Sequence, residues 1–65
     1  MHFNPLDGLK IANDMATVYA MAHAHGVEKM PSLPAILGAL PTLLSDIATQ
    51  DWAKLKADLQ ALVAA

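Results

Sequence analysis

Apolar residues recur along the chain three and four positions apart, the spacing that gathers side chains on one face of an α-helix. The first run follows Asn4 and Pro5, which predict a helix start because Asn caps helices and Pro suits the first helical position. Phe3 is expected to pack on the first turn. Gly26 predicts the other end, since glycine takes the left-handed conformation that terminates helices. The first helix is expected over residues 5–25.

A second apolar run follows Ser32, a predicted cap, and Pro41 interrupts it. Proline removes a backbone donor and clashes with the preceding turn, so the helix expected over 33–48 is either kinked or split at Pro41. The apolar spacing continues across the proline and favours one bent unit. Thr49 is expected to cap a last helix over residues 50–64.

No stretch alternates apolar and polar residues over the length of a strand. The sequence therefore predicts an all-α fold, a small antiparallel arrangement of three helices in a single domain over residues 1–65. A chain of 65 residues has a core that rarely supplies more than roughly 3–5 kcal/mol, and small domains add disulfides, a metal or association.

The predicted first helix has a narrow polar stripe and an apolar arc wider than the roughly 100° of an ordinary surface helix. This width indicates contacts on more than one side. Asn13 borders the arc and is either a register-setting polar residue between helices or only half exposed. The arc contains Leu9, Ile11, Ala12, Met15, Ala16, Val18, Tyr19, Ala20 and Ala22.

Alanines four residues apart form two series, one at each end of the chain. Each series predicts a low ridge on a helix where another backbone can approach closely. Alanine is also the best helix former, so composition alone produces such series. In the last helix the alanines lie behind a bulky apolar face, which is expected to meet the core while the alanines meet a neighbouring copy. The two series are Ala12, Ala16, Ala20 and Ala24, and Ala53, Ala57, Ala61 and Ala65.

Composition strengthens the case for association. The chain is 55% hydrophobic, has no cysteine and carries a net charge of −2. The absence of cysteine excludes disulfides and thiolate metal sites. Without arginine or a lysine cluster, direct nucleic-acid binding is not expected. Neither a bilayer-spanning apolar run nor a signal peptide is present, so the expected location is the cytoplasm or an intracellularly assembled particle.

Candidate chemistry is sparse. His23 and His25 lie two apart and point to different sides of a helix, so they do not form a metal pair within one chain. His23 is expected as a core or interface histidine. His25 is expected at the C-terminus of the first helix, where the helix dipole favours a positive charge. Asp46 and Asp51 flank a helix junction, where capping explains them. No nucleophile with a base partner and no Gly-rich phosphate loop exists, so we expect no enzyme, cofactor or metal.

The sequence thus predicts a structural subunit that binds copies of itself or other protein subunits, for example in a virion or a multisubunit complex. The alternatives are a membrane-active helical peptide of the bacteriocin type, which the acidic charge argues against, and a regulatory module that accepts a partner helix in an apolar groove. A metal-dependent role ranks third. The expected contact residues are Met15, Val18, Tyr19, Ala20, Trp52, Ala57 and Ala61.

Overall fold

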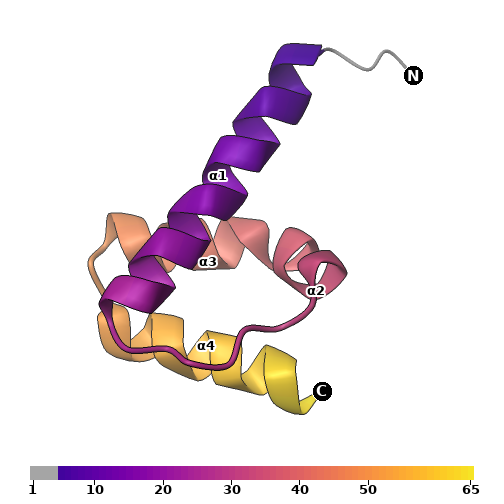
Figure 1. The fold of residues 1–65 in the computed structure, drawn as a ribbon. Helices are drawn as coiled ribbons and strands as arrows, with labels where there is room; N and C mark the ends of the chain where they lie inside the picture. Colours follow the sequence, from indigo (N-terminus) through magenta and orange to yellow (C-terminus); the bar gives the residue numbers. More distant parts are fainter. Residues whose placement is uncertain (1–4) are drawn as a thin grey trace.

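A computed structural model describes residues 5–65 of the chain, with side chains from Asp7 onward. It contains α1 (Pro5–Ala24), α2 (Leu33–Gly38), α3 (Leu40–Ala48) and α4 (Trp52–Ala64), shown in Figure 1. No strand occurs in this part of the chain, so the all-α prediction is confirmed. The predicted cap at Asn4 and the packing of Phe3 lie outside the described residues.

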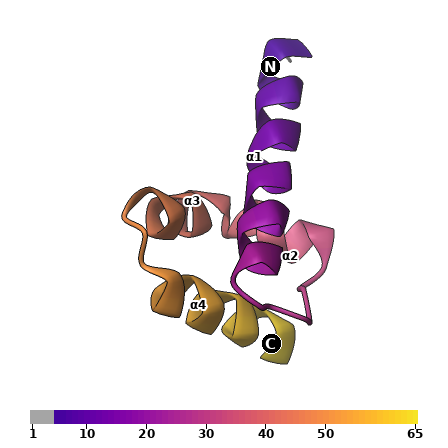
Figure 2. The ribbon, with the colours of Figure 1, turned by 60° about the vertical axis from the view of Figure 1, so that its left-hand side comes forward.

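The helices are arranged around α3, which packs against α1, α2 and α4. Helices α3 and α4 lie side by side and run in opposite directions, joined by a short turn (Figures 1 and 2). Helix α1 crosses them steeply through its C-terminal half. Its N-terminal half extends away from the other helices in both views. One end of α1 is therefore anchored in the core and the other is left uncovered.

The end of α1 is a Schellman motif, as the glycine predicts. The Val27 amide donates to the Ala22 carbonyl at 2.9 Å, and the Gly26 amide donates to the His23 carbonyl at 3.1 Å. Gly26 has φ +83°, a conformation that costs residues with a Cβ atom about 1 kcal/mol. The turn sends the chain back along α4 toward α2.

The same motif ends α3, although no glycine is present there. The amides of Gln50 and Asp51 donate to the carbonyls of Ile47 and Asp46 at 3.0 and 2.9 Å, and Gln50 takes φ +55°. The Thr49 hydroxyl donates back to the Ser45 carbonyl at 2.9 Å. Thr49 therefore closes α3 and does not cap the last helix, which corrects the prediction.

Side-chain caps begin α2 and α4. Ser32 Oγ accepts the Ala35 amide at 3.4 Å, as predicted. The cap of α4 is Asp51, whose Oδ1 accepts the Lys54 amide at 3.2 Å. Asp51 takes this place because the turn at Gln50 delays the start of α4 until Trp52.

The middle segment is split, which confirms one of the two predicted alternatives. The helical backbone is interrupted at Ala39 (φ −102°, ψ 7°), and Pro41 lies in the first turn of α3. The backbone N–H groups of the first turn have no partner within the helix, so a proline there breaks no hydrogen bond. Inside one continuous helix its ring would clash with the preceding turn. The apolar spacing is kept because both short helices face the same core.

The core draws on all four helices. Its central residues have no more than 7% of their surface exposed, and half-buried residues including Met15, Val27 and Trp52 pack around them. Residues far apart in sequence thus hold each other in place. The central residues are Val18, Ala22, Ile36, Leu40, Leu43, Leu55 and Leu59.

We predict that Leu43→Ala unfolds most of the protein. The side chain is fully buried in α3, and such truncations cost about 2–5 kcal/mol, comparable with the total stability of so small a domain. Leu37→Ala is the matched control because Leu37 is exposed, and it should change stability by less than about 1 kcal/mol. Urea unfolding followed by circular dichroism and by the single tryptophan compares them. Equal losses would contradict this core.

A second prediction concerns two glycines whose Cβ position is open space. Gly26→Ala should destabilise the fold by about 1 kcal/mol, because only its positive φ opposes a side chain. Gly38→Ala should instead stabilise it by up to about 0.5 kcal/mol, because the residue lies in α2 with ordinary φ. Thermal unfolding of the two variants should shift in opposite directions, and shifts of the same sign would contradict the Gly26 turn.

Candidate functional site

Helix α1 has two apolar faces, as the wide predicted arc indicates. The inner face packs on the core through Val18 and Ala22, which are fully buried, with Met15 and Met21 half-buried beside them. The outer face is open to solvent. On one side of α1 the two apolar faces are separated by a polar stripe, which includes Lys10, Asp14 and Thr17.

The outer face of α1 has the spacing of a coiled-coil seam. Leu9, Ala12, Ala16, Tyr19 and His23 follow one another at alternating intervals of three and four residues, and all five are exposed. Leu9 has 63% and Tyr19 36% of its surface exposed, both high for large apolar side chains. We call these five residues the outer seam.

The structure separates the contact residues predicted from the sequence. Tyr19 and Ala20 lie on the exposed side of α1, within or beside the outer seam. Met15 and Val18 face the core. Because Val18 is fully buried within the chain, it is not available to a partner in this fold.

Ala57 and Ala61 lie on the exposed back of α4, with Ala53 and Ala64. The front of α4 enters the core through Leu55 and Leu59, so the predicted division of this helix into two faces is confirmed. The back differs from the outer seam in that it carries no large apolar residue and is bordered by Lys56 and Gln60. All eight alanines of the two series are exposed.

Trp52, expected either as a contact residue or in the core, is half-buried against the core. Its indole stacks on the imidazole of His25 with ring centroids 3.9 Å apart and planes inclined by 17°. His25 follows the last turn of α1, so this stack joins the end of α1 to the start of α4. The tryptophan contributes to the fold rather than presenting an open face.

His23 is exposed, so of its two predicted places, the core or an interface, the core is wrong. The bulk of the core contact of α1 is made by Val18 and Ala22, and His23 follows on the outer side. His23 and His25 have different surroundings, as expected from their spacing. Within residues 5–65 no three histidine, aspartate or glutamate side chains converge as metal ligands, and His2 lies outside the described residues.

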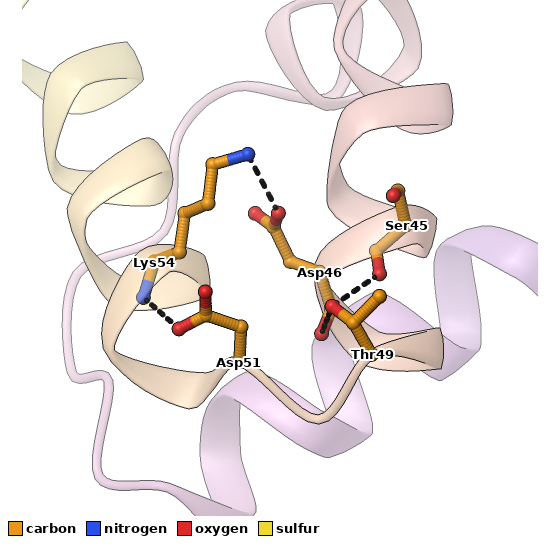
Figure 3. Close-up of polar contacts among 5 residues, drawn as sticks. All are labelled: Ser45, Asp46, Thr49, Asp51 and Lys54. Carbon is orange, nitrogen blue, oxygen red and sulfur yellow. Dashed lines mark hydrogen bonds and ion pairs between the residues drawn. The ribbon is translucent and has the colours of Figure 1, made fainter.

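The α3–α4 junction holds the main buried polar cluster (Figure 3). Asp46 is 2% exposed, and its Oδ1 lies 3.4 Å from Lys54 Nζ. Lys54 of α4 therefore pairs with α3 across the junction. Capping does not explain Asp46, since its carboxylate points toward α4 and only its backbone carbonyl closes the turn.

Asp46 shares this site with Asp58 of α4. The Oδ2 atom of each is buried, and no other described residue offers it a hydrogen-bond donor. A hydrogen bond with the Asp46 side chain, together with burial and the charge of Asp46, raises the pKa of Asp58 above its ordinary value of 3.8. The Lys54 charge opposes this effect. A proton on Asp58 supplies the donor that the pair lacks.

A shallow groove of about 400 Å³ lies between the α1–α2 linker and the C-terminal half of α4. Lys29, Lys56, Glu28 and Gln60 contribute to its walls, with Val27 and Val63 among the apolar residues. The exposed surface of the walls is mainly apolar and includes three charged side chains, Glu28, Lys29 and Lys56. The opposing charges of Glu28 and the two lysines also give the groove no clear preference for an anion.

Comparison of the chain with protein-family models, with curated proteins and with solved structures gives no match. No helix in residues 5–65 has both the length and the apolar character needed to cross a membrane. The function must therefore be argued from the surface itself. Sequence reasoning found the small residues of α1 but missed the outer seam as a unit, although its three–four spacing was visible in the sequence.

The Asp46–Asp58 pair yields a prediction on pH. The folded chain holds the Asp58 proton more tightly than the unfolded chain, so this contribution to stability is present at acid pH and lost as pH rises through the folded-state pKa. Asp58→Asn keeps a donor without the charge. It should raise the urea midpoint at about pH 7 and change it little at about pH 4.

Glu28→Gln serves as the matched control, because Glu28 is exposed in the linker and faces no buried carboxylate. Its urea midpoint should stay close to that of the parent at both pH values. An Asp58→Asn variant that is less stable than the parent at neutral pH would show that the two carboxylates do not share a proton.

Proposed function

We propose that the protein is a small assembly subunit that associates with copies of itself through the outer seam of α1. The observation that carries this proposal is the second apolar face of α1, which the rest of the chain leaves uncovered. Exposed apolar seams at three–four spacing are buried in coiled coils, where each side chain enters a hole on the facing helix.

The small residues at the centre of the seam favour a partner helix. Ala12 and Ala16 are exposed and let another helix backbone approach to the short end of the usual 8–10 Å range. Leu9 and Tyr19 on either side supply apolar area that gains from leaving water. The back of α4 is the weaker candidate because it offers small residues without such apolar area.

The outer seam also favours copies of the same chain over a charged partner. Four of its five residues have uncharged side chains, and the fifth is His23. A contact between two identical copies doubles any net charge that its surface carries, so a seam without acidic or lysine side chains avoids net repulsion between the copies.

Light scattering on the purified chain tests the proposal. The parent should have a molar mass that rises with concentration above the 6.9 kDa of one chain. Ala16→Glu buries a charge in the seam and should weaken association at least about tenfold, while circular dichroism keeps the helical signal of the parent. A parent that remains a helical monomer at millimolar concentration would refute the proposal.

Ala57→Glu is the matched control, since it makes the same change at an exposed alanine in the middle of α4. It should associate as the parent does. If Ala57→Glu dissociates the assembly and Ala16→Glu does not, the contact lies on the back of α4 and the α1 proposal is wrong. If only a second kind of protein chain binds the Leu9 and Tyr19 face, the regulatory module is favoured instead.

A further inference from the structure

We infer that two copies of the chain pair through α1 in an antiparallel arrangement, with Ala12 of each copy against Ala16 of the other. This inference rests on the proposed function and adds the orientation and register of the contact. It follows from the order of residues along the outer seam and from the position of Asn13 beside it.

The first four of the five outer-seam residues have the same order of sizes when read in either direction, and His23 lies beyond them. A large residue, two alanines and a large residue occupy positions 9, 12, 16 and 19. A contact between identical copies related by a two-fold axis must be complementary to itself, so residue i meets residue j and j meets i. Antiparallel pairing with the axis beside residue 14 satisfies this condition: Leu9 meets Tyr19 of the second copy, and the alanines meet each other.

This register places the narrowest part of the contact at its centre. Ala12 and Ala16 allow the two backbones to come closest there, and the large side chains close both ends against water. Shifting the pairing by one heptad toward the N-terminus would set Leu9 against Ala12 of the second copy. That shift would set Ala16 of each copy against Pro5, the first residue of α1, and would carry Tyr19 past the start of that helix.

Two features favour the antiparallel over the parallel direction. Antiparallel helices place the partial charges of their macrodipoles next to charges of opposite sign. Asn13 is exposed and borders the seam one residue from the axis, so the antiparallel pair brings the two Asn13 side chains together across it. Amide groups donate and accept, and two of them satisfy each other. In a parallel pair Asn13 would instead face the side of the partner that carries Gly8 and Met15.

A polar residue at a helix contact specifies register at some cost in affinity. Asn13 fits this role because its side chain makes no hydrogen bond within the described part of the chain. Its backbone carbonyl accepts the Thr17 hydroxyl at 2.9 Å, which leaves the side-chain amide available.

Disulfide trapping in the full chain tests this arrangement, since the parent has no cysteine. Ala12→Cys and Ala16→Cys are small changes at exposed positions, and the two variants are mixed and oxidised by air. Disulfides form only where Cα atoms come within about 4.4–6.8 Å. The expected product is the mixed dimer, which joins position 12 of one copy to position 16 of the other, at least about fivefold in excess of either symmetric dimer.

Each other outcome rejects a distinct part of the inference. Both symmetric dimers in excess would show a parallel pair, and one symmetric dimer alone would show an antiparallel pair in another register. A chain that light scattering shows to associate without any of these disulfides would place the contact elsewhere and overturn the inference. A monomeric parent would refute the proposed function itself.

Asn13→Ala provides a second readout. Combined with the two cysteine variants, it should leave association intact or stronger while the excess of the mixed dimer falls by at least about threefold. Thr17→Ala is the control, because it lies on the polar stripe and should leave the product ratio unchanged. An unchanged ratio with Asn13→Ala would reject its role in setting the register.

Discussion

The packing of three helices around α3 is the constraint on which the rest of the structure depends. Helix α3 is the element that packs against all three other helices, and helices this short gain most of their stability from such packing. Leu40 and Leu43 lie at the centre of that contact. Because α1 crosses α3 and α4 steeply, these two helices cover only part of its length. The exposed half of α1 is a consequence of this crossing.

The same constraint explains the strain and the buried charge at the α3–α4 junction. To bring α4 back along α3, the chain must turn within Thr49 to Asp51, and Gln50 takes a left-handed conformation that glycine would take at lower cost. Asp46 is carried into the contact by the last turn of α3. Lys54 and Asp58 then lie opposite it; the ion pair with Lys54 reduces the cost of burying its carboxylate, and Asp46 in turn raises the pKa of Asp58. Asp46, Lys54 and Asp58 therefore lie at the α3–α4 contact, which determines the direction of α4.

The sequence predicts the helices better than it predicts their surroundings. Caps and breakers such as Ser32 and Gly26 act within one turn, so the local sequence is sufficient to identify them. The cap role of Thr49 and the core alternative for His23 were wrong, because they depend on how α4 turns back and how α1 rotates on α3. Asp46 shows the limit most clearly: an aspartate between two helices resembles a cap, and only the packing of α4 reveals that it is buried.

The candidate surface illustrates the opposite case. Its residues were all present in the predicted first helix, yet the sequence could not separate Val18, which the core uses, from Tyr19, which it does not. Once α3 occupies one side of α1, the exposed residues of the outer seam stand out by their own three–four spacing, while Ile11 is also exposed and lies outside the seam. An isolated helix gains little by keeping large apolar residues such as Leu9 in water. In the proposed association, a second α1 would cover these residues along the part of the helix that α3 and α4 leave open.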